Sequence, residues 1–254
     1  MLLSSSVEGL SLSEIGSLYF ANHITLPPAS STPLHRWKME EDDAPILQYL
    51  YRAHQPRRHL EFGTWQGWGT VLCLEACEAT VWTINLPAGE MRPDGTWAYG
   101  QRVVDGTDAP YGIITATYGQ DESGPCTYHR TDAAGYIGRF YREKGLSHRV
   151  CQVFCDSRKW DTSNYPAGFF DSVLVDGGHQ PDVVMSDTRK ALPLLRSGGL
   201  MIWHDFCPLS EIRSQFESVK GVTEGLEPIF PELRTELQRV FWINPSWILL
   251  GIKK

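Results

Sequence analysis

Two short polar stretches in the carboxyl-terminal half of the chain carry residue types suited to chemistry. Asp176 and His179 belong to an Asp-Gly-Gly-His sequence that follows an apolar run, and His204-Asp205 follows a second apolar run. Carboxylate oxygens are good ligands for Mg²⁺, and an imidazole, with an unperturbed pKa of about 6.5, can remove a hydroxyl proton near neutrality. If the two runs are neighbouring parallel strands, their polar ends meet where such folds bind ligands.

These polar side chains also have purely structural interpretations. His179 could cap the helix that follows it, and His204 could be buried against Trp203. Asp187, farther along the chain, could be a further ligand, orient another group or be a surface charge. The sequence alone leaves both kinds of interpretation open.

A glycine-rich segment at 59–70 joins a predicted strand to a predicted helix. Glycines there let the backbone turn sharply and approach a ligand, and the amino terminus of the helix offers unpaired N–H groups. Glu61, at the end of the strand, could bind a cationic amine. A plain tight strand–helix connection is the alternative. The loop residues expected to contact a ligand are Gly63, Thr64, Trp65 and Gly67.

Strands and helices alternate along most of the chain, which predicts an α/β fold with a doubly wound, mostly parallel sheet. Two final apolar runs, 237–243 and 247–252, are separated by Asn-Pro-Ser and predict a C-terminal antiparallel hairpin. The other strands are predicted at 58–62, 79–86, 149–155, 170–175 and 200–204. Helices are predicted at 43–55, 70–78, 131–144, 181–196, where a bend at Pro193 and a stop at Ser197-Gly198-Gly199 are expected, and 209–219.

The Glu-x-Gly-x-x-x-Gly arrangement at 61–67 resembles motif I of class I S-adenosylmethionine-dependent methyltransferases. It does not match the Gly-x-Gly-x-x-Gly fingerprint of nicotinamide or flavin proteins. Residues 149–206 resemble more closely the small-molecule O-methyltransferase group, whose members carry Asp-Gly-Gly-His and a downstream His-Asp. The resemblance covers about residues 58–206 and implies a Rossmann-like methyltransferase fold with S-adenosylmethionine as cofactor.

The resemblance also implies roles for individual cofactor-binding residues. Glu61 would hold the methionine ammonium group, and Asp176 would also contact the cofactor. Asp156 and Ser157 match the place where relatives contact the adenine, although a loop-capping pair is an alternative. Relatives hold the ribose with an acid where this chain has Asn85, and an amide cannot bind both hydroxyls as a carboxylate does.

The chain is similar, more distantly, to the metal-dependent catechol O-methyltransferases. Their metal-binding acids correspond to Asp176 and Asp205, and their catalytic lysine corresponds to His179. The resemblance therefore implies that His179 is the general base and that the two acids hold Mg²⁺. The third metal ligand would fall on Phe206, which cannot coordinate, and the neighbouring His204 is the substitute that the sequence offers.

Composition limits the classes of partner. The chain has 254 residues, a formal net charge of −7 and 42% hydrophobic residues, which is typical of one globular domain and unfavourable for binding nucleic acid. Six cysteines without a Cys-x-x-Cys pair indicate free thiols in a reducing compartment. No apolar run approaches the roughly 20 residues that span a bilayer. We expect a cytoplasmic protein that binds no membrane.

Two segments stand apart from the regular pattern. Residues 1–40 are rich in Ser and Pro and form an N-terminal extension. Residues 15–20 predict a short helix that packs over the site as part of a lid, and a partly ordered tail is the alternative. Residues 41–254 form a single methyltransferase domain. Its insertion at about 87–130 has no clear periodicity and is expected to be a lid or a contact in a homo-oligomer.

Three functional hypotheses follow. The first is transfer of a methyl group from S-adenosylmethionine to a hydroxyl of a small-molecule acceptor, such as a sugar or a natural product, with the assistance of Mg²⁺. The second is a metal-dependent hydrolase or hydroxylase that uses Asp176, His179, His204 and Asp205. The third is a non-catalytic relative that binds the cofactor, which Asn85 and Phe206 make conceivable.

Overall fold

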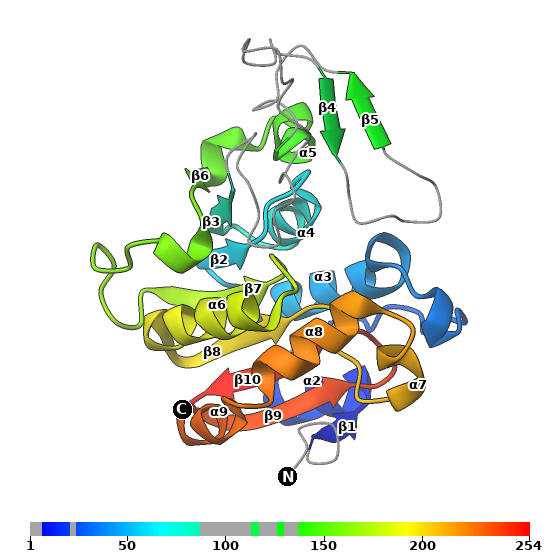
Figure 1. Cartoon of the computed structure of the whole chain (residues 1–254). Helices are drawn as coiled ribbons and strands as arrows, with labels where there is room; N and C mark the ends of the chain where they lie inside the picture. Colours follow the sequence, from blue (N-terminus) through cyan, green and yellow to red (C-terminus); the bar gives the residue numbers. More distant parts are fainter. Residues whose placement is uncertain (1–6, 21–23, 87–112, 117–125, 130–136) are drawn as a thin grey trace.

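An eight-stranded sheet forms the framework of the chain, whose computed structural model describes residues 7–20, 24–86, 113–116, 126–129 and 137–254 (Figure 1). In the order in which they lie side by side, its strands are β1 (Glu8–Leu10), β9 (Leu237–Ile243), β10 (Leu249–Lys253), β8 (Leu195–Trp203), β7 (Phe170–Val175), β2 (Arg58–Phe62), β3 (Thr80–Asn85) and β6 (Val150–Phe154).

The directions of the strands confirm the predicted doubly wound sheet. The strands β6, β3, β2, β7 and β8 are parallel, whereas β10 is antiparallel to both β8 and β9. The C-terminal hairpin is therefore also confirmed. The chain leaves β2 toward β3 and β6 and then crosses back to β7 on the other side of β2. A crevice for ligands is expected at the carboxyl ends of β2 and β7, where the strand order reverses.

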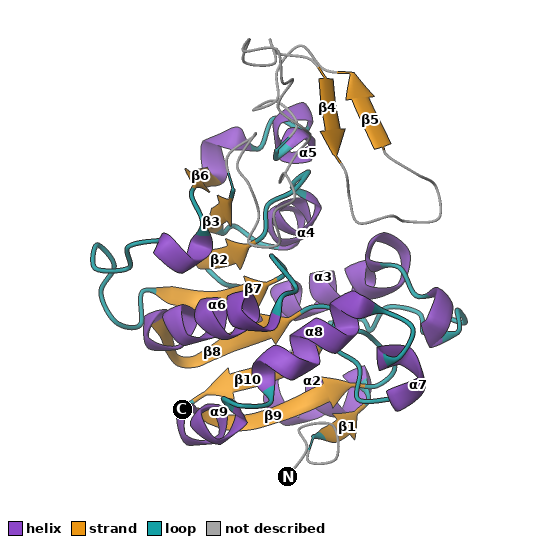
Figure 2. Ribbon diagram, in the orientation of Figure 1, coloured by secondary structure: helices purple, strands orange, loops and turns teal. Residues whose placement is uncertain are grey.

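Helices cover both faces of this sheet. In the ribbon view, α6 and α8 lie in front of the sheet, and they pack on each other; α3 packs on α4 (Figure 2). The helices are α2 (Leu12–Tyr19), α3 (Ala44–His54), α4 (Trp68–Ala76), α5 (Arg139–Glu143), α6 (Pro181–Leu194), α7 (Ser210–Arg213), α8 (Glu217–Leu226) and α9 (Phe230–Glu236), with a π-helical turn at Met39–Asp43 and 3₁₀ turns at Leu34–Arg36, Ser147–Arg149 and Ser157–Lys159.

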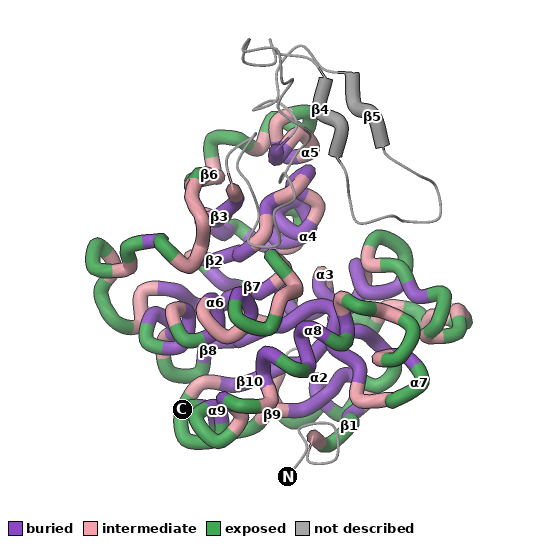
Figure 3. Tube along the Cα trace, viewed as in Figure 1, coloured by how far each residue is buried: buried purple, intermediate pink, exposed green. Residues whose placement is uncertain are grey.

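Burial follows the sheet. All six residues of β7 are buried, as expected for a central parallel strand that is covered on both faces, and the buried positions run through the middle of the chain trace (Figure 3). The register pairs Phe62 of β2 with Val175 of β7. Gly63 and Asp176, the next residue of each strand, are therefore brought side by side.

Asp171 holds the opposite ends of the same strands together. Its Oδ2 accepts hydrogen bonds from the backbone N–H groups of Arg57 and Arg58 at 2.9 and 2.8 Å, and its Oδ1 accepts one from Nε of Arg196 at 2.5 Å. Arg58 begins β2 and Arg196 lies in β8. Charge-assisted bonds of this kind fix the register of β2, β7 and β8.

One predicted helix boundary is wrong. Helix α6 ends at Leu194, and the sequence Ser197-Gly198-Gly199, expected to end it, lies inside β8. The register between β7 and β8 shifts at this point, and a Cβ on Gly199 would lie 2.8 Å from the backbone oxygen of Asp171. The glycine is thus required for the close approach of two strands.

The remaining differences concern short elements. The helix predicted at 209–219 is two helices, α7 and α8, and α9 was not predicted. The described part of the helix predicted at 131–144 is α5, and residues 130–136 lie outside the described residues. Within the predicted insertion, β4 (Ile113–Ala116) and β5 (Cys126–His129) form a two-stranded antiparallel sheet, and the rest lies outside the described residues.

The N-terminal segment packs on the edge of the sheet. The predicted helix at 15–20 is α2, which begins with a Ser11–Glu14 capping box. Tyr19 stacks on Phe241 of β9, while β1 pairs with the same strand. In the part of the chain that the model describes, no helix has the length and apolar character needed to span a bilayer.

Candidate active site

A cavity of about 810 Å³ lies at the carboxyl ends of the central strands. A volume of this size is typical of pockets for drug-sized ligands and cofactors. Its lining residues come from the segments 63–69, 84–86, 155–158, 176–187, 204–205 and 217–224, together with Met39 and Trp247. The two polar stretches and the glycine-rich segment singled out from the sequence thus open into one cavity.

Gly63 is the tightest point of the loop. Its φ of +99° favours glycine, and a Cβ there would lie 2.1 Å from the backbone oxygen of Asp176. The backbone N–H of Gly63 donates to the carbonyl of Ile84, and that of Asp176 donates to the carbonyl of Phe62, both at 2.9 Å. The loop therefore rests directly on the end of β7.

Two other loop residues adopt left-handed backbone conformations. Trp65 has a φ of +41°, and Oδ1 of Asn85 accepts a hydrogen bond from its N–H at 2.9 Å. Gly67, with a φ of +86°, precedes α4 and packs against Tyr141 and Gly138 without lining the cavity. Asn85 therefore shapes the loop, in addition to lining the cavity.

The structure differs from the sequence prediction at Glu61. Its side chain lies beneath the loop, 1% exposed, and it is not among the residues that line the cavity. The hydroxyls of Thr70 and Thr83 donate to its Oε2, and Thr83 also bonds to Thr64. Burial raises the pKa of Glu61 to about 8, although the threonine hydrogen bonds oppose the shift. In this conformation Glu61 supports the loop from below, and its contact with an ammonium group stays a prediction.

Asp156 and Ser157 line the cavity at the end of β6, as predicted. The carboxylate of Asp156, however, is bound to Arg158: Oδ1 accepts from the backbone N–H and from Nε, and Oδ2 accepts from Nη2 at 2.8 Å. Asp156 thus resembles the loop-capping alternative more than a ligand-binding acid. The nearby Ser157 side chain partly offsets the rise that burial causes in the pKa of Asp187.

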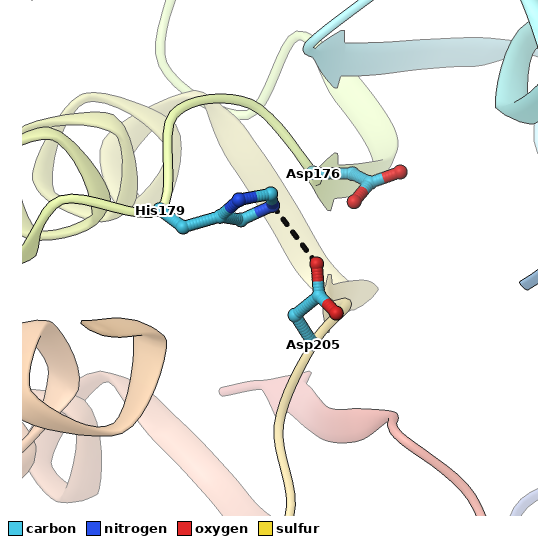
Figure 4. Close-up of side chains that lie close together, drawn as sticks. All are labelled: Asp176, His179 and Asp205. Carbon is cyan, nitrogen blue, oxygen red and sulfur yellow. Dashed lines mark ion pairs between the residues drawn. The ribbon is translucent and has the colours of Figure 1, made fainter. Parts of the chain in front are cut away.

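Three side chains converge at the ends of β7 and β8 (Figure 4). Asp176, His179 and Asp205 each offer a ligand atom, and these atoms all lie within 4.8 Å of one another. Nε2 of His179 is 2.8 Å from Oδ2 of Asp205. All three residues line the cavity. The cluster could hold a divalent cation or orient His179 as a base.

The backbone of Asp205 explains how it joins this cluster. Its φ of +55° turns the chain sharply after β8, and Ser218 donates a hydrogen bond to its Oδ1 at 3.2 Å. Asp tolerates the left-handed region better than most residues, although strained backbone of this kind is concentrated at functional sites. Phe206, which follows, is fully buried, as its apolar side chain requires.

His204 occupies a different place from the one predicted. Its Nδ1 lies 3.1 Å from Oδ1 of Asp176, and its Nε2 lies 3.1 Å from Oδ2 of the buried Asp43. Both ring nitrogens therefore face carboxylates, which leaves no nitrogen for a metal ion in this conformation. His179, rather than His204, completes the cluster with Asp176 and Asp205.

The carboxylates determine the charge of both histidines. Burial disfavours the imidazolium form of His179, but Asp205 and Asp176 outweigh this effect and raise its pKa above the usual value. The same balance holds the pKa of the fully buried His204 well above its usual range. For Asp205, burial opposes ionisation, but His179 and His204 keep its pKa well below the usual range. The raised pKa makes His179 a stronger base once its proton has left.

The tryptophans divide between cavity and core. Trp65 and Trp68 line the cavity, whereas Trp203 is fully buried and donates from Nε1 to the hydroxyl of Thr188 at 2.9 Å. Trp247 also lines the cavity and was not predicted to do so. Its position after the Asn-Pro-Ser turn of the hairpin gave no local signal of a cavity.

Asp43 is a second residue whose role the sequence did not reveal. It immediately precedes α3, but its side chain makes no capping hydrogen bond. Instead its Oδ1 accepts from the backbone N–H of Trp247 and its Oδ2 faces His204. The contact joins residues 161 positions apart in the sequence, so no local pattern indicates it.

Comparison with known proteins identifies the family. Residues 60–206, more than half of the chain, match the family model of a methyltransferase domain. The chain belongs to this methyltransferase family. It is an S-adenosylmethionine-dependent methyltransferase, and the matched segment begins in β2 and ends just after Asp205. No curated protein matches the chain in sequence.

Solved structures confirm the fold of this methyltransferase. PaMTH1, an SAH-bound methyltransferase of Podospora anserina, has a TM-score of 0.51 and 13% identity over 83% of this chain and 77% of its own. An O-methyltransferase from Bacillus cereus in complex with SAH has a TM-score of 0.51 and 16% identity over 96% of this chain and 89% of its own. An O-methyltransferase family protein from Burkholderia thailandensis has a TM-score of 0.52 and 12% identity over 84% of this chain and 55% of its own. At these identities the likeness concerns the Rossmann-like fold.

Gly63→Ala tests whether the close approach of the loop to Asp176 is needed for the cofactor. The added Cβ would meet backbone, which cannot move aside cheaply, so we expect loss of SAH binding by at least about tenfold in calorimetry. Gly145→Ala is the matched control. Gly145 also has a positive φ, +71°, but has no atom within 4 Å of the added Cβ. It should lose about 1 kcal/mol of stability and keep SAH affinity; equal losses in both variants would contradict the prediction.

Glu61→Gln tests the burial of Glu61. Because the pKa of this carboxyl is about 8 in the folded chain and near 4.5 when unfolded, the native state resists its ionisation. The contribution of Glu61 to stability should therefore be lost as the pH rises from about 4.5 to 8. In urea unfolding, the glutamine variant should gain stability relative to the parent over this window. The exposed Glu40→Gln should show no such trend, and a pH-independent difference for Glu61→Gln would refute the assignment.

Proposed function

We propose that this methyltransferase transfers the methyl group of S-adenosylmethionine to a hydroxyl oxygen of a small molecule. The observation that carries the proposal is the meeting of Asp176, His179 and Asp205 in the cavity that the glycine-rich loop also lines. A base beside the cofactor loop suits an acceptor whose proton must leave as the methyl group arrives. Two of the similar structures are named as O-methyltransferases, which supports the same acceptor atom.

The described residues fit the cofactor. The loop at Gly63 brings bare backbone to the edge of the cavity, and the amino terminus of α4 follows it, which is a suitable place for the polar end of a ligand. In α6, which packs on the 3₁₀ turn after β6, Oδ1 of Asp187 is buried and, among the described residues, has no hydrogen-bond partner. When bound, S-adenosylmethionine supplies an electrophilic methyl carbon on a sulfonium. The chain then has to position the acceptor and take its proton.

His179 and Asp205 perform the proton transfer in this proposal. Nε2 of His179 faces Asp205, so Nδ1 is the nitrogen that accepts the proton of the acceptor hydroxyl. As that proton moves to His179, the oxygen forms a bond to the methyl carbon. The carbon–sulfur bond breaks and its electron pair stays on sulfur, so the products are a methyl ether and S-adenosylhomocysteine. Asp205 stabilises the imidazolium that results.

Asp176 is the acid that holds the acceptor. His204, fixed between Asp176 and Asp43, restricts the direction of the Asp176 carboxylate. A restrained carboxylate at the end of β7 can accept a hydrogen bond from a second polar group of the acceptor. Holding the acceptor in one orientation raises the rate, because the reacting atoms stay in line.

A metal ion is a second way of using the same cluster. Two carboxylates and one imidazole suit ions such as Mn²⁺ or Zn²⁺ at least as well as Mg²⁺, which prefers oxygen ligands. A bound ion would lower the pKa of the acceptor hydroxyl. In that case His179 would be a ligand and not the base, so the two mechanisms make different predictions.

The formal net charge of the chain, −7, and the size of the cavity, about 810 Å³, favour a small-molecule acceptor over nucleic acid. The family match favours the methyltransferase hypothesis over a metal-dependent hydrolase or hydroxylase. A cytoplasmic location, a homo-oligomer, and a lid formed by residues 1–40 or 87–130 stay predictions. Met39 is the described residue of the N-terminal extension that lines the cavity.

His179→Ala tests the base. With a panel of phenols and sugars as acceptors and SAH formation as the readout, we expect turnover to fall by about 10²- to 10⁴-fold while SAH affinity in calorimetry changes little. His148→Ala is the control, because His148 is exposed and contacts only the backbone of Gly145 among the described residues. If the His179 variant keeps its turnover, or loses cofactor affinity in proportion, His179 is structural. A parent enzyme that binds SAH but methylates no acceptor would support the non-catalytic alternative.

Chelation separates the two uses of the cluster. If a metal is required, EDTA should abolish SAH formation, Mn²⁺ or Mg²⁺ should restore it, and Asp205→Asn should weaken Mn²⁺ binding in calorimetry at least about tenfold. If His179 is the base, EDTA should leave the rate unchanged. Metal-independent turnover together with an active His179→Ala variant would contradict both mechanisms.

A further inference from the structure

Asp187 is a buried acid in the cavity wall that the proposed chemistry does not use. It lies in α6, is 1% exposed, and lines the cavity. Its Oδ1 is buried and has no hydrogen-bond partner among the described residues. A buried, unpaired carboxylate oxygen costs free energy unless a ligand or water satisfies it. A polar group that enters the cavity could satisfy it.

The neighbouring cations are engaged elsewhere. Arg158 binds Asp156 and Asp182, and Nζ of Lys190 donates to the backbone oxygen of Trp160 at 2.5 Å. Burial raises the pKa of Asp187 to about 7, and the nearby Ser157 side chain opposes this shift. One oxygen of this carboxyl group is therefore left to a neutral donor.

The position of Asp187 indicates which part of the cofactor supplies that donor. Helix α6 packs on the 3₁₀ turn Ser157–Lys159 after β6, the segment whose sequence implied contact with the adenine. Two other positions at this end of the cavity offer no free carboxylate to the cofactor. Asn85 stands at the end of β3, and the carboxylate of Asp156 is bound by Arg158. Asp187 is the acid at this end of the cavity with an oxygen still to be paired.

We propose that Oδ1 of Asp187 accepts a hydrogen bond from the exocyclic amino group of the adenine and thereby selects an adenosyl cofactor. The proposal rests on the binding of S-adenosylmethionine. It concerns a residue that positions the adenine and takes no part in the proton transfer assigned to His179. Helix α6 would then serve two parts of the site. Its first turn closely follows His179, and Asp187 in its middle contacts the adenine.

The analogue S-inosylhomocysteine provides the test, because its base carries a keto oxygen where adenine carries an amino group. In calorimetry at about pH 9, where a carboxyl with a pKa of about 7 is ionised, the parent should bind SAH about 10- to 100-fold more tightly than this analogue, because two acceptors would face each other in the inosine complex. Asp187→Asn keeps the size of the side chain and adds an amide donor that can face the keto oxygen. Its preference for SAH should fall to within about threefold, or reverse.

Three controls make the outcome decisive. Asp187→Ala, which removes the acceptor, should also bind both ligands with similar affinity, and it replaces the asparagine variant if that variant does not fold. Asp161→Asn, an exposed acid bound only to Ser163 among the described residues, should keep the preference of the parent. Asn85→Ala should weaken the binding of SAH and of S-inosylhomocysteine to the same extent.

The outcomes separate the inference from the function on which it rests. If both Asp187 variants keep the preference of the parent for SAH, or lose affinity for both ligands equally, Asp187 is structural and the proposal is overturned while the methyltransferase stands. If the parent itself binds neither ligand, the proposal fails together with cofactor binding.

Discussion

The contact between Gly63 and the backbone of Asp176 is the constraint on which the site depends. The reversal of strand order places β2 and β7 side by side, and a side chain larger than hydrogen at 63 would collide with the end of β7. This closeness makes one cavity out of the cofactor loop and the acidic cluster. The loop is held from the other side by Asn85 and from below by Glu61, so three strands share in its shape.

Charge compensation organises the other half of the cavity. Asp43, Asp176 and Asp205 would repel one another if they were unpaired, and His204 and His179 lie between them. The buried imidazole of His204 separates an acid of the N-terminal half from the acid at the end of β7. Its role is therefore to fix the acids, which leaves His179, partly exposed in the cavity, as the nitrogen base available to a ligand.

The accuracy of the sequence predictions follows the range of the interactions involved. The strand Phe170–Val175 was predicted at its observed bounds, because an apolar run between turn residues is a local pattern. The end of α6 was misplaced, because Ser197-Gly198-Gly199 looks like a helix stop, whereas Gly199 serves a close contact between strands. Glu61 was expected to face a ligand, because neither its burial nor its contacts with Thr70 and Thr83 can be seen in the local sequence.

The sequence by itself determined the class of fold, the parallel core strands with their closing hairpin, and the candidate groups of the site, because hydrophobic periodicity and glycine spacing are properties of neighbouring residues. The tertiary structure decided which candidates act together. It joined His179 to Asp176 and Asp205, turned His204 toward Asp43, and left an oxygen of Asp187 unpaired in the cavity wall. These outcomes depend on distances between residues far apart in the chain, and packing alone sets those distances.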